Sequence, residues 1–293
     1  MKFIKAMNCK DLNGKTIAIT GATGGIGREL CDYILNLGAN LILLDRNAEK
    51  SHALGKKLLN KYSNAKIEYI TTDLEDFESV TRSCEILKSK PIDIFIHNAG
   101  AYSIPRKKCD TGYDNVFQIN FVSPYYIIRE LLPILEKRKE SRVIVVGSIA
   151  HNYSKTDEND IDFSKIKAAS KVYGNSKRYL MFSLYELFKN ETKVKLSVTH
   201  PGITFTNITA HYPKVIFAII KYPMKIIFMK PKKAMLSIAE GLFTDCNYHE
   251  WIGPKLFNIW GKPKLKRLST CNQAESEKIG KTADSIYTKL KST

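Results

Sequence analysis

A short apolar run that leads directly into a glycine-rich loop limits most strongly what this chain can fold into. Residues 15–20 (Lys-Thr-Ile-Ala-Ile-Thr) are β-branched and typical of a buried strand. The loop 21–27 (Gly-Ala-Thr-Gly-Gly-Ile-Gly) follows at once, and then apolar residues recur at helical spacing. In such a unit glycine lets the backbone approach a pyrophosphate, and the helix N-terminus supplies free amides. The pattern predicts a dinucleotide cradle; a purely structural turn is the alternative.

Strand-like and helix-like segments alternate along the first two thirds of the chain. Further strands are expected at residues 40–45, 66–72, 92–96, 142–147 and 194–200. Helical patterns lie between them, among others at 112–138 and about 172–189. Such alternation predicts an α/β fold, a Rossmann-type doubly wound, mainly parallel sheet with helices on both faces. Without repeats or low-complexity linkers, the 293 residues are expected to form one domain, 1–293.

The alternation stops near residue 205. Residues 205–230 are aromatic and aliphatic with interspersed lysines, a helix is expected at 231–243, and the basic tail after Trp260 is expected to be helical. We expect 205–260 to form the wall or lid of a pocket for a hydrophobic substrate. An ordinary core or a subunit contact would explain the same aromatic residues.

Several predicted strand ends carry residues suited to a dinucleotide. Asp45 stands 18 residues past Gly27, where a carboxylate suits a ribose 2′-hydroxyl and repels a 2′-phosphate. Arg46 could instead pair with that phosphate. The two residues therefore favour different cofactors, and we expect NAD(H) to be preferred over NADP(H). Asp73 could bind an adenine amino group or cap the helix expected at 75–88, or do both. The small residues at 98–100 would let the backbone pass close to a cofactor ribose.

Two residues four positions apart on one predicted helix form the candidate catalytic pair. Tyr173 and Lys177 share a helix face at this spacing. A free phenol titrates near ~10, roughly 4 kcal/mol too high for easy proton exchange at neutral pH. A cation about 4 Å away supplies about that much at an effective dielectric near 20. Tyr173 could therefore act as a general acid/base toward a hydroxyl or carbonyl.

Two further polar residues are candidates for the same site. Ser148 follows the predicted strand 142–147, and ligands of open parallel sheets bind beyond that end of the strands. Asn120 lies in an apolar helical stretch, so its amide needs a partner or a water. It is a candidate relay, with a satisfied core amide as the alternative.

The composition is strongly basic, with a formal net charge of +17 and a pI near 9.5. Nucleic acid, an anionic membrane surface or an anionic cofactor would each account for such a charge. The lysines are spread along the chain, with one denser patch at 262–267, and no nucleic-acid-binding motif accompanies them. We therefore interpret the charge as a solvated basic surface and expect no nucleic-acid partner.

Cysteine usage and apolar runs bear on the compartment. The six cysteines form no Cys-x-x-Cys and no Cys/His cluster, which indicates reduced thiols in a cytoplasmic protein and no metal site. Residues 1–11 lack the apolar core of a secretory signal. The run 215–229 is too short and too charged to span a bilayer, although it could lie on a surface.

In order and at sensible spacing, these motifs resemble the short-chain dehydrogenase/reductase family over about residues 12–205. The polar stretch 151–171, which follows Ser-x-Ala-His and contains Ile-Asp-Phe, is similar to its retinol-dehydrogenase-like and WW-domain-oxidoreductase-like branch. His97 stands where the family usually has asparagine. Asp45 differs from the uncharged residue that many NADP-using members of the branch carry before arginine. The motifs that carry the resemblance are Thr20-Gly-x-x-x-Gly-Ile-Gly27, Asp73, Asn98-Ala-Gly100, Asn120, Ser148, Tyr173-x-x-x-Lys177 and Pro201-Gly202.

The resemblance implies hydride transfer between a nicotinamide cofactor and an alcohol or carbonyl, with a steroid, retinoid or lipid-like substrate. Tyr173 would exchange the proton, Ser148 would hold the substrate oxygen, and Lys177 would lower the Tyr173 pKa and bind the ribose. Asn120 would hold a water that connects Lys177 to solvent, and Thr204 would contact the nicotinamide carboxamide. The expected cofactor-binding residues are Gly21, Thr23, Gly25, Ile26, Gly27, Asp45, Arg46, Asp73, Leu74, Asn98, Ala99, Gly100, Tyr173, Lys177, Pro201, Gly202 and Thr204.

Relatives commonly pair through the helices that carry Asn120 and Tyr173, which implies a homodimer or homotetramer. Alternatively, the basic segment 211–233 could dock on a membrane, which would favour a monomer or dimer. Two other classes of function stay open. One is a dinucleotide-binding redox sensor or regulatory scaffold without turnover, and the other is a basic protein that binds membranes or nucleic acid and merely uses this fold.

Overall fold

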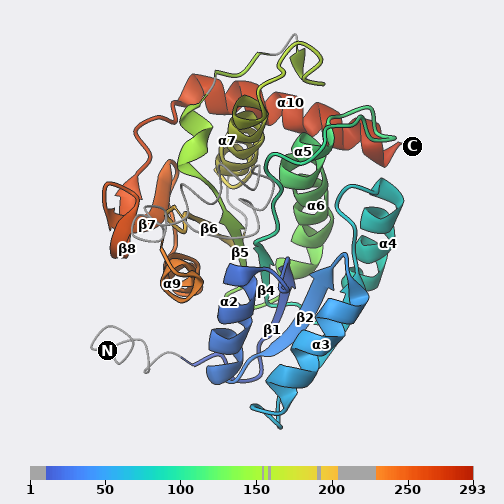
Figure 1. Ribbon diagram of the computed structural model, residues 1–293, viewed down its shortest axis with the longest axis vertical. Helices are drawn as coiled ribbons and strands as arrows, with labels where there is room; N and C mark the ends of the chain where they lie inside the picture. Colours follow the sequence, from blue (N-terminus) through green and yellow to red (C-terminus); the bar gives the residue numbers. More distant parts are fainter. Residues whose placement is uncertain (1–10, 154, 158–159, 190–192, 204–228, 293) are drawn as a thin grey trace, which may run out of the picture.

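Eight strands form one sheet in the residues that the computed structural model describes, which are 11–153, 155–157, 160–189, 193–203 and 229–292. The strands are β1 (Thr16–Thr20), β2 (Asn40–Asp45), β3 (Ile67–Thr71), β4 (Ile94–His97), β5 (Arg142–Val146), β6 (Lys195–Thr199), β7 (Glu250–Leu256) and β8 (Trp260–Arg267). Their order is β3-β2-β1-β4-β5-β6-β7-β8; β1 to β7 are parallel and β8 is antiparallel to β7 (Figure 1). The predicted doubly wound, mainly parallel α/β fold is confirmed.

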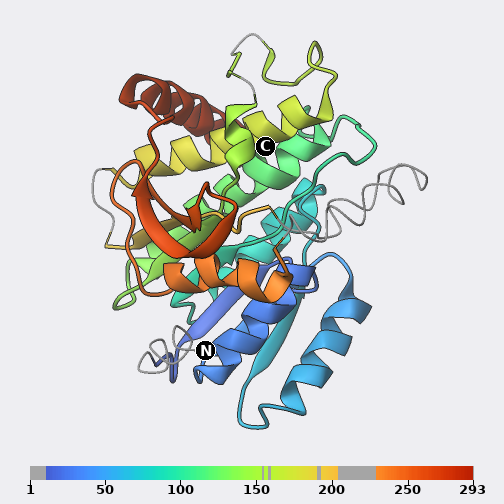
Figure 2. The same cartoon turned by 60° about the vertical axis from the view of Figure 1, so that its left-hand side comes forward.

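Helices cover both faces of this sheet. They are α2 (Gly25–Asn36), α3 (Ala48–Leu59), α4 (Phe77–Lys88), α5 (Asn115–Phe117), α6 (Ser123–Leu135), α7 (Ala169–Leu187), α9 (Pro231–Gly241) and α10 (Gln273–Lys291), with the π-helical turn η1 (Gln118–Val122) and the 3₁₀ turn η2 (Ile149–Asn152). Buried side chains of α2, α3 and α9 pack on one face, and those of α4, α6 and α7 on the other. Figure 2 shows α9 beside α2. None of the described helices is both long and apolar enough to cross a membrane.

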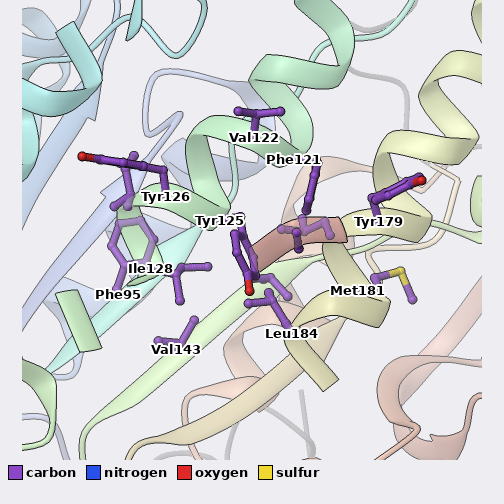
Figure 3. Packing of buried hydrophobic residues seen from close by; sticks show 14 of the residues in the cluster. Phe95, Phe121, Val122, Tyr125, Tyr126, Ile128, Val143, Tyr179, Met181 and Leu184 are labelled. Carbon is purple, nitrogen blue, oxygen red and sulfur yellow. The ribbon is translucent and has the colours of Figure 1, made fainter. Parts of the chain in front are cut away.

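The core under α6 and α7 is aromatic. The rings of Phe121 and Tyr179 lie 5.3 Å apart between centroids, and Phe121 also contacts Tyr125 at 5.7 Å (Figure 3). All three are almost fully buried, as is Val143 of β5 in the same cluster. A fully buried side chain of this size contributes about 1.5–3 kcal/mol. This packing fixes α7, the helix that carries the candidate catalytic pair, against the sheet.

The C-terminal third differs from the sequence-based prediction in one respect. The expected helices at 231–243 and in the tail are present as α9 and α10. The strands β7 and β8 were missed, and the basic patch 262–267 lies on β8. Proline and glycine interrupt both strands, the pairing slips between Pro254 and Leu256, and β8 is a lysine-rich edge strand. Such features are typical of sheet edges but erase the alternation that identifies a strand.

Of the two roles left open for Asp73, capping of α4 is wrong, because another carboxylate caps this helix. The Asp76 side chain accepts hydrogen bonds from Glu78 N and Ser79 N and is the N-cap. Asp73 instead accepts a bond from Glu75 N at 3.0 Å, in the turn that precedes the helix. A carboxylate at either position satisfies free amides, and the one directly before the first helical turn does so for the helix.

Helix α10 crosses the outer side of α7 and reaches α6 (Figure 1). A buried carboxylate, Glu130 of α6, holds its far end by accepting from Tyr287 Oη at 2.6 Å and from Lys291 Nζ at 2.5 Å. Lys88 of α4 lies 2.6 Å from the other carboxylate oxygen. Burial alone would raise the pKa of Glu130, but these hydrogen bonds lower it to about 2.

Glu130→Gln should therefore reduce the free energy of unfolding by roughly 1–3 kcal/mol at pH 7, since two lysines lose their counter-charge. Because the folded-state pKa lies below the unfolded one, the carboxylate stabilises above about pH 4.5 and loses this effect as pH falls toward 2. Urea unfolding at pH 7 and pH 3 measures both. A variant with an equal deficit at the two pH values would contradict the assignment.

Candidate active site

A pocket of about 660 Å³ opens at the carboxyl ends of β1, β2, β4, β5 and β6. This is the edge where the sheet order turns back between β1 and β4, the usual ligand site of such sheets. Predicted residues that line it are Gly21, Thr23, Gly25, Ile26, Gly27, Asp45, Arg46, Asp73, Leu74, Asn98, Ala99, Gly100, Ser148, Tyr173, Lys177, Pro201 and Gly202. Asn120 is buried behind the wall, and Thr204 lies outside the described residues, as do residues 205–228 of the predicted lid 205–260. The described rest of that segment forms mainly α9 and β7 and does not line this pocket.

The glycine loop has no room for side chains. Gly21 has a φ of +69°, and a Cβ there would lie 2.8 Å from the Cα of Ala99. A Cβ on Gly27 would lie 2.2 Å from the carbonyl oxygen of Gly21. Gly24 is the N-cap of α2 and offers no side-chain acceptor to the amides of the first turn. These amides line the pocket, and no capping side chain accepts a hydrogen bond from them. Such free amides fit a pyrophosphate.

Residues after β4 clasp this loop. Thr20 Oγ1 accepts from the amides of Asn98 and Ala99, both at 3.1 Å. The Asn98 amide group donates to the carbonyls of Thr20 at 3.2 Å and Gly21 at 2.9 Å. With two bonds accepted, Thr20 Oγ1 can donate only to His97 Nδ1, 3.0 Å away. Burial and then Lys177 place the pKa of His97 well below its usual value, so the imidazole is neutral and structural.

Asp45 lies in the pocket wall with both carboxylate oxygens already in use. Oδ1 accepts from the amide and hydroxyl of Thr23, at 3.1 and 3.0 Å, and Oδ2 accepts from Ser51 at 3.0 Å. The side chain is thus fixed, although a carboxylate has about four acceptor positions and one ribose hydroxyl can still be bound. Arg46 and Lys50 are exposed on the same rim and carry the opposite charge.

Ser148 and Tyr173 meet at the inner end of the pocket. Ser148 follows β5 and its Oγ accepts from Ala150 N at 3.2 Å, which starts η2. Burial raises the pKa of Tyr173 to about 12, and a hydrogen bond from the Ser148 side chain opposes this by lowering it. Ser148 is therefore the group that stabilises the phenolate in this structure.

The expected effect of Lys177 on the pKa of Tyr173 is absent in this structure. Lys177 Nζ donates to the carbonyl of Val146 at 2.9 Å and lies 6.0 Å from the centroid of the Tyr173 ring. The side chain is 3% exposed, and burial lowers its pKa to about 8. Shared helix face and spacing placed the two residues together as predicted, but a backbone carbonyl holds the ammonium away from the phenol.

Asn120 has the buried partner that the sequence required. Its Oδ1 accepts from Ala101 N at 2.9 Å and its Nδ2 donates to Ala101 O at 2.8 Å. It sits within the π-helical turn η1, a distortion common at functional sites. A Cβ built on Gly100 would lie 3.1 Å from Asn120 Oδ1 and 3.6 Å from Lys177 Nζ. The amide therefore lies close to Lys177, while its bonds to Ala101 are those of a structural residue; the relay stays a prediction.

Two contacts with the C-terminal part of the chain lie next to the candidate catalytic residues, and sequence reasoning missed both. His151 Nδ1 donates to the carbonyl of Ser148 at 2.6 Å, and its Nε2 lies 2.6 Å from Thr270 Oγ1. Arg178, directly after Lys177, forms a bidentate pair with Glu275 of α10 at 2.5 Å. Their partners are 119 and 97 residues away, so no local pattern could reveal them.

The outer wall of the pocket is apolar and aromatic. Tyr102 packs edge-on against Tyr173, with centroids 5.1 Å apart. Further side chains of this wall are Ile104, Ile149, Tyr153 and Ile203. No group of three or more potential metal ligands occurs in the described part of the chain. The arrangement thus combines an anion cradle, a hydroxyl–phenol pair and an apolar wall in one pocket.

Comparisons with known proteins agree on a family. A family model described as short chain dehydrogenase matches residues 15–214. WW domain-containing oxidoreductase from Homo sapiens is 31% identical over 214 residues, which cover 68% of this chain and 51% of that protein. Retinol dehydrogenase 14 from Mus musculus is 27% identical over 267 residues, covering 82% and 80%. The chain thus spans about half the length of the WW-domain relatives it matches.

Solved structures share the fold. A Mycobacterium paratuberculosis protein of uncharacterised function has a TM-score of 0.72 at 20% identity, covering 97% of this chain and 96% of that one. A short-chain dehydrogenase from Sphingobium yanoikuyae in complex with NADPH has a TM-score of 0.60 at 19% identity, covering 78% and 84%.

The buried Lys177 should make the pocket a source of instability. Lowering its pKa from 10.5 to about 8 corresponds to roughly 3 kcal/mol, from which about 1 kcal/mol for the lost bond to Val146 is subtracted in Lys177→Met. The free energy of unfolding of the variant should therefore be about 2 kcal/mol higher than that of the parent at pH 7. Below pH 8 both states of the parent are charged and the full penalty applies; it vanishes as pH rises toward 10.5. Equal stability at pH 7, measured in urea, would argue against a buried cation.

Proposed function

The chain belongs to the short-chain dehydrogenases, in the branch of WW-domain oxidoreductases and retinol dehydrogenases, and on that premise we propose that it is an NAD(P)-dependent oxidoreductase. It would transfer a hydride between nicotinamide and a hydrophobic alcohol or carbonyl, with Tyr173 as general acid/base. The observation that supports this most directly is that Ser148 and Tyr173 share one pocket with the free N-terminus of α2.

The pocket fits a dinucleotide along its length. The amides of residues 25–27 would bind the pyrophosphate, since no side chain caps this end of α2 and the amides line the pocket. Asp45 would bind the adenosine ribose, and Lys177 would bind the other ribose. When bound, the nicotinamide supplies or accepts the hydride, while the protein orients the substrate and moves the proton. Thr204, which lies outside the described residues, is retained as a proposed contact of the carboxamide.

Proton transfer would begin at the Tyr173 hydroxyl. Ser148 lies close enough to the phenol to lower its pKa, so a substrate oxygen placed between the two hydroxyls would receive two hydrogen bonds and be held for transfer. Tyr173 would donate its proton to a carbonyl oxygen in reduction, or accept one from an alcohol in oxidation. Release of Lys177 from Val146 toward the phenol would lower the Tyr173 pKa from about 12 toward the working range. Asn120 would connect Lys177 to solvent through a water.

The substrate is proposed to be hydrophobic, such as a steroid, retinoid or lipid-like alcohol or ketone. The apolar wall formed by Tyr102, Ile104, Ile149, Tyr153 and Ile203 supports this, because such surface binds apolar ligands. One of the relatives is a retinol dehydrogenase, which is consistent with the same class.

NAD(H) is proposed as the preferred cofactor. Asp45 is a fixed, buried negative charge where the 2′-phosphate of NADP(H) would lie, and repulsion is strong at such a position. Arg46 and Lys50 oppose this preference from the exposed rim, where solvent screens their charge.

We propose that the protein forms a homodimer or homotetramer in the cytoplasm, with peripheral membrane contact. The outer side of α7 is covered by α10 of the same chain, so pairing would use another surface than the one first expected.

A dinucleotide-binding sensor or scaffold without turnover is the second candidate. Two observations favour it: burial raises the pKa of the Tyr173 phenol to about 12, and the Lys177 ammonium is bonded to the carbonyl of Val146.

Tyr173→Phe should reduce turnover by at least 10³-fold, because it removes the transferable proton and leaves the rest of the side chain in place. The measurement is absorbance of the reduced nicotinamide with a panel of hydrophobic secondary alcohols and ketones. NAD(H) and NADP(H) binding, followed by fluorescence, serves as the control and should be unchanged. Full turnover in the variant would refute the role of Tyr173; binding without turnover in the parent would favour the sensor.

Asp45→Ser should raise the ratio of NADP(H) to NAD(H) use at least tenfold, since it removes the buried charge and keeps a hydroxyl acceptor for Thr23. Ser51→Ala is the matched control, because it removes one bond to Asp45 but leaves the charge. A ratio that stays flat in Asp45→Ser and falls in Arg46→Ala would assign the choice to Arg46.

A further inference from the structure

Exposed apolar side chains gather at the end of the β7–β8 hairpin. Of the five large apolar side chains that are exposed in the described residues, three lie in this turn. Phe257 is 84% exposed, Leu256 53% and Trp260 38%. We call residues 255–262 the hairpin tip. A contiguous apolar group of this kind on a surface indicates a site of interaction.

The hairpin tip is held in a defined shape. Phe257 and Asn258 have φ values of +51° and +57°, a conformation that is rare for a bulky side chain such as Phe257. Lys266 Nζ donates to Asn258 Oδ1 at 2.7 Å and to Pro254 O at 2.5 Å. His200 Nε2 donates to Asn258 O at 2.8 Å. These bonds hold Asn258 inward and leave Phe257 pointing to solvent, so the apolar surface is built before any partner binds.

The tip and the strand β8 that follows it are basic. From Trp251 to Asn272 the chain contains no acidic residue. It carries five cations there: Lys255 and Lys262 in the tip, Lys264 and Lys266 along β8, and Arg267 at the far end of β8, opposite Glu250. All of them except Lys266 are exposed. A partner that fits this surface is therefore both anionic and able to receive aromatic and aliphatic side chains.

The hairpin tip also borders the pocket. A Cβ on Gly202 would lie 2.6 Å from Ile259 O and 3.1 Å from Pro254 Cγ. Gly202 and His200 both line the pocket, and His200 is the residue that bonds Asn258. Since β7 runs parallel to β6, its end and the tip project from the same edge of the sheet as the pocket. Whatever covers the tip thus lies beside the apolar wall.

We propose that the hairpin tip docks on the surface of an anionic lipid bilayer. Leu256, Phe257 and Trp260 would enter the interface between headgroups and acyl chains, and the surrounding lysines would face lipid phosphates and carboxylates. The dinucleotide end of the pocket would stay in water. This docking rests on the proposed function, because a hydrophobic alcohol that the pocket takes would partition into the membrane beside it.

A bilayer matches the two features together better than the other anionic or apolar partners. A second copy of this chain would bring the same five cations against themselves, which is repulsive at an isologous contact. Nucleic acid would use the cations but leave Phe257 and Leu256 in water, apart from stacking. An anionic bilayer takes up both the apolar and the charged groups.

The test is co-sedimentation of the full chain with vesicles of phosphatidylcholine alone or with 30% (about one third) phosphatidylserine, at low and high salt. Leu256→Ser with Phe257→Asn removes the apolar side chains, and asparagine tolerates the positive φ. Lys255→Glu with Lys264→Glu reverses two charges. The matched controls are Ile86→Ser, which replaces an apolar side chain of α4 that is 41% exposed, and the exposed pair Lys56→Glu with Lys57→Glu on α3.

The parent should bind the phosphatidylserine vesicles at least tenfold more tightly than the neutral ones, and high salt should weaken this. Both tip variants should lose at least tenfold, and both controls should bind like the parent. Fluorescence titration with NAD(H) should be equal in all proteins, which separates failure of docking from failure of the cofactor site.

Tip variants that bind vesicles like the parent would overturn the proposal. So would a parent that binds no vesicles while light scattering shows a dimer that the tip variants lose, because the occupant would then be a second copy. Binding to duplex DNA with none to vesicles would overturn it as well.

Discussion

The close approach of two backbone segments at the ends of β1 and β4 is the constraint on which the candidate site depends. Gly21 and Ala99 come so near that no side chain fits on the glycine, and the bonds from Asn98 and Ala99 to Thr20 and Gly21 lock this approach. The geometry opens the crevice at the point where the strand order reverses. It also directs the first amides of α2 into the crevice rather than toward a capping side chain.

The other residues of the candidate site are arranged around this crevice. Ser148 follows the end of β5, and α7 lays Tyr173 and Lys177 across the same opening because the aromatic core fixes it on the sheet. His151 with Thr270 and Arg178 with Glu275 then hold this region from behind. Burial lowers the pKa of both Lys177 and His97, and the Lys177 ammonium is held on the carbonyl of Val146 at a stability penalty.

The sequence predicted what depends on local pattern. The first six strands, the glycine loop and the residues at the strand ends were found because hydrophobic period and motif spacing report them directly. The β7–β8 hairpin was missed because proline, glycine and lysine obscure its alternation. Lys177 could bond either the phenol or a backbone carbonyl, and either Asp73 or Asp76 could cap α4. Residue spacing does not show which partner is used. Contacts between residues about a hundred positions apart, such as Arg178 with Glu275, leave no local signal at all.

The position of α10 has a consequence for how the protein is made. Ribosomes deliver the chain from its N-terminus, and domains of this size fold with many long-range contacts still to be formed. Every element of the sheet and the whole of α7 emerge before Glu275, Tyr287 and Lys291, which attach α10 to α7 and α6. During synthesis the helix that carries Tyr173 therefore has one side open to water. A nascent chain at that stage still lacks the bonds that join α10 to α7 and α6, so the packing of the helix that carries Tyr173 is incomplete until α10 has been made.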